Sequence, residues 1–109
     1  MKHIIWLGSS YNDLLDFPKE AKKVAGYNLD KIQRGIEPYD WKPITSIGAG
    51  VREIRIHCNN EYRIIYLAQR EEGVYVLHSF VKKTQKTSSK DIEIAKKRFK
   101  SIPIPIGNL

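Results

Sequence analysis

Basic and aromatic side chains alternate along three nearby segments of the chain, at positions that β-strands would place on one face. These residues are Arg55, His57, Arg63, His78, Phe80 and Lys82. Arginine offers paired donors that match phosphate oxygens, lysine adds a point charge, and an aromatic ring can stack on a base. Histidine, with an ordinary pKa of about 6.5, can also carry a proton. These residue types indicate chemistry on a phosphate backbone that bears stackable bases.

Other chemistries lack the residues that they need. The sequence has no carboxylate pair placed for glycoside hydrolysis and no glycine-rich phosphate loop of the nucleotidase type. Its one cysteine, Cys58, cannot form an internal disulfide and has no metal-ligand spacing around it. We therefore expect neither a metal site nor a cofactor.

Positive charge is concentrated in the last quarter of the chain. The formal net charge is +7, and the stretch from Lys82 to Lys100 holds eight basic residues against two acidic ones. A basic surface suits nucleic acid, an anionic membrane or an acidic protein. A lysine-rich helix face that is only solvated remains the alternative at this point.

Length and composition predict one domain over residues 1–109, with a short tail over 104–109. The chain has 109 residues, of which 41% are hydrophobic and 28% charged, as in ordinary globular proteins. The start MKHIIWLGSS is too short and too soon polar for a signal peptide, and no apolar run approaches membrane length. We therefore expect a cytoplasmic protein without a membrane partner.

Hydrophobic spacing and turn residues divide the chain into helices and strands. Apolar residues recur at helical spacing from Ala21 to Ile32, and Gly35 is placed to end that helix. Ser10 with Asp13, and later Ser88 with Asp91, have the capping-box spacing. The expected elements are a strand over 3–7, a helical turn over 10–16, a helix over 18–34, a loop over 36–50, strands over 51–58, 61–69 and 74–81, and a helix from 88 to 102.

The short connections between the last three strands require antiparallel hairpins. With the first strand added, this order predicts an α+β domain with a four-stranded antiparallel sheet. We expect N-terminal helices and the C-terminal helix on one face and an open second face. A three-residue turn over 59–61, which pairs His57 with Arg63, keeps the arginines off the isoleucine face. The next turn pairs Arg63 with Phe80 and residue 65 with His78.

Two segments also resemble a known family. EYRIIY (61–66) and LHSFVKKTQKT (77–87), followed by a basic helix, resemble the phage-related HigB-type branch of the RelE/ParE toxin superfamily. The order of elements is similar as well, so the resemblance covers residues 3–102. It implies a RelE-like fold and the toxin of a type II toxin–antitoxin pair, which cleaves mRNA on the translating ribosome.

The resemblance further implies partners and site residues. The partners are a cognate antitoxin with a helix-turn-helix domain, mRNA on the ribosome, and operator DNA reached only through the antitoxin complex. Arg63, Lys82 and Lys83 match the family's catalytic positions, with His78 as a further candidate. The expected RNA-binding residues are Arg55, His57, Phe80 and Lys86.

One departure from the family pattern leaves the general acid and base open. The best-known RelE pattern has a tyrosine close behind the last basic cluster, and here Thr84, Gln85 and Lys86 follow instead. Two alternatives therefore remain at this stage: a ParE-like toxin that inhibits gyrase, and an RNA- or ribosome-binding module without catalysis.

Overall fold

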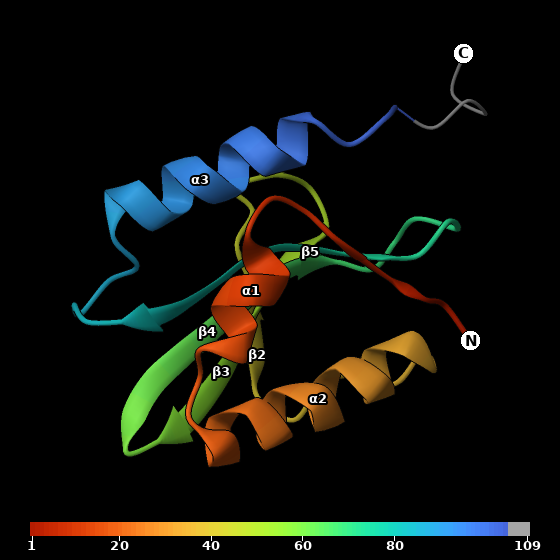
Figure 1. The fold of residues 1–109 in the computed structure, drawn as a ribbon. Coiled ribbons are helices and arrows are strands. Elements are labelled where there is room, and N and C mark those ends of the chain that lie inside the picture. The colour runs from red at the N-terminus through yellow and green to blue at the C-terminus, as the bar shows by residue number, and fades with distance from the viewer. Residues whose placement is uncertain (105–109) are drawn as a thin grey trace.

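Five strands form one sheet in the computed structural model, which describes residues 1–104. The predicted tail lies outside the described residues from 105 onward. The strand order across the sheet is β1-β5-β4-β3-β2 (Figure 1). In chain order the elements are β1 (Ile4–Trp6), α1 (Ser10–Leu15), α2 (Lys19–Gln33), β2 (Trp41–Pro43), β3 (Val51–Cys58), β4 (Asn60–Leu67), β5 (Val74–Lys82) and α3 (Ser89–Lys100).

The sheet differs from the predicted four-stranded antiparallel one in two ways. β1 pairs with β5 in parallel, because the whole of α1 to β4 lies between them as a long crossover. The fifth strand, β2, comes from the segment predicted as a loop and pairs antiparallel with β3. β2 is three residues long and sits at the sheet edge, where its Pro43 is tolerated.

The prediction that all helices cover one face, and that the other face is open, was wrong. Figure 1 shows α2 and α3 on opposite sides of the sheet, with α1 beside β5. The α2 side buries one core cluster, in which Ala25 and Leu29 pack with Ile54 and Ile64 of the sheet. The α3 side buries a second cluster around Ala95. The core is therefore divided into two layers by the sheet.

The helix boundaries follow local capping. The Ser88 side chain accepts a hydrogen bond from the Asp91 backbone N–H, which confirms the predicted start of α3. Gly35, with φ of 78°, follows the end of α2 as predicted. At α1 the predicted cap was one residue off: Ser9 precedes the helix, and the Ser10 hydroxyl instead donates to the Val76 carbonyl at 3.1 Å.

The pairing of β3 with β4 keeps the predicted faces but shifts the register. Arg63 pairs with Arg55 rather than with His57, because the chain reverses at Asn59 alone, in a left-handed conformation with φ of 66°. A shift of two residues leaves every side chain on its predicted side of the sheet.

Between β4 and β5 the predicted pairing of Arg63 with Phe80 is confirmed. In β5, Tyr75 and Leu77 were predicted on the face opposite Phe80, and this was wrong, because a register shift opposite Ile65 and Tyr66 places them in the same core cluster as Phe80.

Candidate functional site

Five charged side chains form a line of alternating sign across the end of the sheet. Arg55 Nε donates to Asp40 Oδ1 at 3.0 Å, and Arg55 Nη2 lies 2.9 Å from the same oxygen. The other Asp40 oxygen lies 2.8 Å from His57 Nε2. His57 Nδ1 lies 2.7 and 2.8 Å from the two Glu61 oxygens, and Arg63 Nη2 donates to Glu61 Oε1 at 3.0 Å. We call these five residues the charge chain.

The backbone of three elements holds the charge chain in place. Arg55 and Arg63 are paired residues of β3 and β4, so their side chains leave the sheet side by side. His57 and Glu61 form the next pair toward the tight turn. Asp40 precedes β2, and its carbonyl accepts from the Arg55 backbone N–H at 2.8 Å, which places its carboxylate at the arginine.

The two carboxylates set the protonation of His57. The hydrogen bond to Glu61, followed by the one to Asp40, raises the pKa of His57 above its ordinary value. The hydrogen bond from His57 in turn lowers the pKa of Asp40, and it also lowers that of Glu61, with Arg63 as the next contributor. Both ring nitrogens of His57 lie within hydrogen-bond distance of a carboxylate, and the raised pKa favours the imidazolium form, in which both N–H groups would donate. In this form it can act as a proton donor.

A second ion pair lies beneath the charge chain. Arg63 Nε is 3.6 Å from Glu53 Oε1, and the two side chains are 5% and 0% exposed. Thr87 Oγ1 donates to the other Glu53 oxygen at 3.1 Å, so the loop after β5 crosses the sheet face and covers this pair. Lys42 approaches Glu53 to 3.9 Å from the edge strand β2. Arg63 is thus firmly oriented but almost closed off from solvent.

His78 and Phe80 are buried next to α3 rather than presented on an open surface. His78 Nε2 lies 2.7 Å from Asp91 Oδ1, and the His78 ring stacks on Phe80 with centroids 4.8 Å apart. The His78 side chain is 7% exposed. Their places on this sheet face match the predicted parity, but α3 covers them. This arrangement ties the start of α3 to β5.

The accessible cations follow the end of β5. Lys82 is partly buried and pairs in register with Glu61, whereas Lys83 and Lys86 are exposed in the loop to α3. None of these three lysines makes an ion pair within residues 1–104. They therefore supply positive charge beside the charge chain that no described carboxylate cancels.

The structure thus gathers only part of the predicted site into an accessible group. Arg55 and His57 are accessible, Lys83 and Lys86 lie in the adjoining loop, and Arg63, His78 and Phe80 are buried. Three acidic residues were missed: Asp40, Glu53 and Glu61. Strand alternation puts Glu53 with Arg55, and Glu61 with Arg63, so two of the three had a signal in the sequence. Asp40 comes from a loop, where alternation gives no signal.

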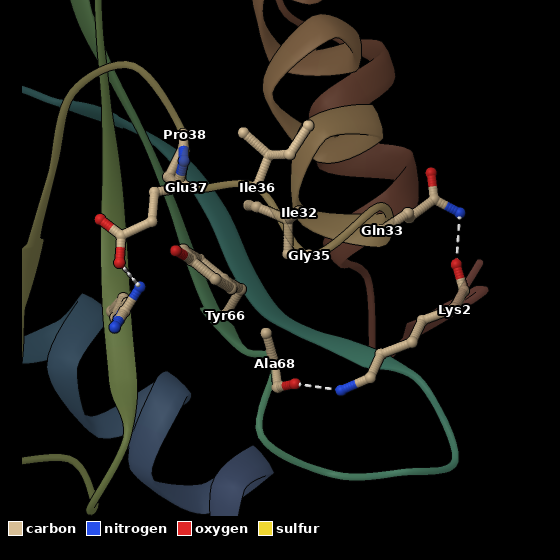
Figure 2. Close-up of a pocket in the computed structure, with 10 residues that line it drawn as sticks. Lys2, Ile32, Gln33, Gly35, Ile36, Glu37, Pro38, Tyr66 and Ala68 are labelled. Atoms are coloured by element: carbon tan, nitrogen blue, oxygen red, sulfur yellow. Dashed lines mark hydrogen bonds and ion pairs between the residues drawn. The ribbon is translucent and has the colours of Figure 1, made fainter.

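A separate hollow of about 200 Å³ lies on the α2 side of the sheet, away from the charge chain. Figure 2 shows Tyr66 between Pro38 and Ala68 in this hollow, with Gln33 hydrogen-bonded to the Lys2 carbonyl on the right of the view. Burial raises the pKa of Tyr66. The hollow shares no residue with the charge chain.

Two further observations bear on the class of site. Among residues 1–104, no group of three or more His, Cys, Asp or Glu side chains is arranged to hold a metal ion. No helix in the same range is long and apolar enough to cross a membrane.

Comparison with protein families gives one match that spans most of the chain. Residues 12–100 match the family described as "Phage derived protein Gp49-like (DUF891)". The matched range contains the complete charge chain and the three lysines after it. The comparison with curated proteins gave no match.

Proposed function

We propose that this chain, which belongs to the Gp49-like family of RelE/HigB-type toxins, is the toxin of a type II toxin–antitoxin pair and cleaves mRNA on the translating ribosome. Membership of this family supports a toxin function and an antitoxin partner. Beyond family membership, we propose that the targets are mRNA and the ribosome and that the chain belongs to the HigB-like branch. The protein would act in the cytoplasm, where translation takes place.

One observation carries the RNA part of the proposal: the accessible Arg55 of β3 stands beside lysines that have no described acidic partner. Arg55 has a 37% exposed side chain, and Lys83 and Lys86 are exposed. Guanidinium and ammonium groups in this arrangement suit successive phosphates of a single strand. The net charge of +7 also favours an acidic partner segment and rapid, salt-sensitive association.

The proposed reaction uses the ribose 2′-hydroxyl of the substrate as nucleophile. The 2′-hydroxyl gives its proton to solvent, the 2′-oxygen attacks the adjacent phosphorus, the bond to the 5′-oxygen breaks, and a 2′,3′-cyclic phosphate and a 5′-hydroxyl result. Arg55 and Lys83 would stabilise the charge that develops on the phosphorane oxygens. His57, held as an imidazolium, would give its proton to the departing 5′-oxygen. The ribosome would supply the in-line geometry.

The buried residues take supporting roles in this proposal. Arg63 acts as a positioning residue, because it holds Glu61 and through it His57. His78 fixes the start of α3 through Asp91, and so holds the loop that carries Lys83 and Lys86. Lys82 borders the charge chain across from Glu61 and completes the basic set.

The test is the mapping of RNA 5′ ends in a bacterium after brief induction of the chain. New 5′ ends inside translated codons, which disappear when initiation is blocked, are the expected result. Purified ribosomes programmed with one mRNA should give the same ends.

A matched control separates chemistry from expression effects. His57→Gln removes the proton donor from the charge chain, whereas His3→Gln changes an exposed histidine at the other end of the molecule. Cleavage should fall only in the first variant. DNA breaks without new RNA ends would instead assign the chain to gyrase inhibition, and ribosome binding without either would leave a binding module. Both outcomes overturn the proposal.

A further inference from the structure

We propose that Asp40 and Glu61 are specificity-determining residues that keep free RNA from binding tightly. The Asp40 carboxylate occupies an Arg55 donor that an RNA phosphate needs, and Glu61 holds Asp40 there through His57. This inference rests on the proposed function, since it concerns access of RNA to the same residues. It assigns a role to two acidic residues at a site whose expected ligand is itself an anion.

The Arg55 donors are the groups for which Asp40 and an RNA phosphate would compete. Arginine binds a phosphate best through Nε and one Nη, which point in parallel. In this structure Arg55 Nε donates to Asp40 Oδ1 at 3.0 Å, and Nη2 lies 2.9 Å from the same oxygen. The Asp40 carboxylate therefore stands where a phosphate oxygen would stand. A phosphate can reach the same donors only after this carboxylate has moved.

Neighbouring cations hold the Asp40 and Glu61 carboxylates in place. Asp40 is bound through its second oxygen by His57, and Glu61 is bound by His57 and Arg63. Displacement of Asp40 therefore breaks contacts to two cations at once. A phosphate brings one negative charge in place of another, so the exchange gains little from net charge. RNA that is held only weakly would not displace Asp40 from Arg55.

Whether an RNA phosphate can displace the Asp40 carboxylate depends on how the RNA is presented. Asp40 lies outside the regular strands, and its side chain is 27% exposed, so it can swing away without breaking the sheet. A strand that is already fixed in place, as on the ribosome, gives up little further freedom and gains the arginine contacts. The carboxylates thus favour presented RNA over free RNA.

A purely stabilising role for the two carboxylates makes a different prediction. If they only neutralise arginines for the sake of the fold, their removal lowers stability and leaves the affinity for RNA unchanged or weaker. If they exclude free RNA, removal of their charge raises the affinity. Affinity for RNA off the ribosome therefore separates the two roles.

The experiment measures binding of a fluorescein-labelled, single-stranded RNA with 2′-O-methyl riboses, which cannot supply the nucleophile. Asp40→Asn and Glu61→Gln keep the side-chain shapes and remove one negative charge each. We expect each to bind the RNA about tenfold more tightly than the unchanged chain in about 0.1 M salt, with a steeper salt dependence.

Two matched variants complete the design. Glu37→Gln removes one negative charge from an exposed partner of Arg52, outside the charge chain, and should change affinity by less than about twofold. Asp40→Glu keeps the charge and should keep the weak binding. Thermal unfolding of each variant confirms that it is folded.

The outcomes for this inference and for the proposed function are distinct. If Asp40→Asn and Glu61→Gln bind RNA no more tightly than Glu37→Gln, the exclusion role is wrong, whatever the 5′-end mapping shows. If affinity rises as expected but the unchanged chain produces no new RNA ends, the exclusion role stands as a property of RNA binding and the cleavage proposal fails.

Discussion

Arg63 and Glu53 lie against each other on the α3 side of the sheet, with Nε 3.6 Å from Oε1, and both side chains are almost completely buried. Neither of these two atoms has a hydrogen-bond partner within residues 1–104. A buried ion pair of this kind adds little net stability, but loss of one partner leaves an uncompensated charge in a poorly solvated place. The pair therefore makes the fold sensitive to either residue.

Replacement of Arg63 should destabilise the protein rather than remove only a site residue. We expect Arg63→Ala to lower the free energy of unfolding by about 3–5 kcal/mol, because the buried Glu53 then keeps only the half-exposed Lys42, at 3.9 Å, as a cation. Urea unfolding followed by circular dichroism measures this change. Arg55→Ala, at the more exposed end of the charge chain, should cost no more than about 1 kcal/mol.

A double variant checks the cause. Arg63→Met with Glu53→Gln removes both charges and should recover most of the stability lost by Arg63→Ala. If the double variant is no more stable than Arg63→Ala, the loss comes from packing and not from the isolated charge.

His57 should titrate above the ordinary histidine range, since its hydrogen bonds to Glu61 and Asp40 raise its pKa. NMR titration of the imidazole signals measures this directly. Glu61→Gln should lower the pKa of His57 more than Asp40→Asn does, because the Glu61 bond is the larger cause. Equal pKa values in all three proteins would contradict the charge chain.

The same shift has a consequence for stability against pH. A group with a raised pKa in the folded state contributes stability that is complete below its unfolded pKa of about 6.5. That contribution is lost as the pH rises through the higher folded pKa. The difference in stability between the unchanged chain and His57→Gln should therefore shrink as the pH is raised through this window.

Lys83 and Lys86 should bind RNA mainly through phosphate charge. We expect Lys83→Ala and Lys86→Ala each to weaken binding of single-stranded RNA and to reduce the slope of log affinity against log salt by about 0.7. Lys23→Ala serves as the control, because this exposed lysine lies on α2, across the sheet. An equal effect of Lys23→Ala would show that total charge, not the loop after β5, governs binding.

The start of α3 should depend on its cap. Ser88→Ala removes the acceptor for the Asp91 N–H and should lower the free energy of unfolding by about 1 kcal/mol. Ser89→Ala, one residue later and exposed, should change it by less than about 0.5 kcal/mol. Urea unfolding of the two variants provides the comparison, and similar losses in both would argue against the cap.

Patterns within one element predicted that element well. Apolar spacing from Ala21 to Ile32 predicted α2, and strand alternation placed Arg55, Arg63 and Phe80 on one face. These successes share a cause, since helical and strand periods are properties of the local backbone.

Relations between distant elements were harder to predict. The apolar seam of α3 is visible in the sequence, but it does not say which face of the sheet the seam covers. A clue was present in β4, where Ile64, Ile65, Tyr66 and Leu67 are consecutive, apolar and all buried. Such a run is typical of a strand covered on both faces. Asp40 reached the site through strand pairing at the sheet edge, which no local period reports.

Leu77 has no partner in the pairing of β5 with β4, because Ile65 pairs with His78 and Tyr66 with Val76. Before this bulge the even-numbered Val76 faces α2, and after it the even-numbered Phe80 faces α3. Deletion of a single codon here would leave the strand composition nearly unchanged and yet exchange the α3 face for the α2 face over its last five residues. We therefore expect related sequences to differ more in the residues of this segment than in its length.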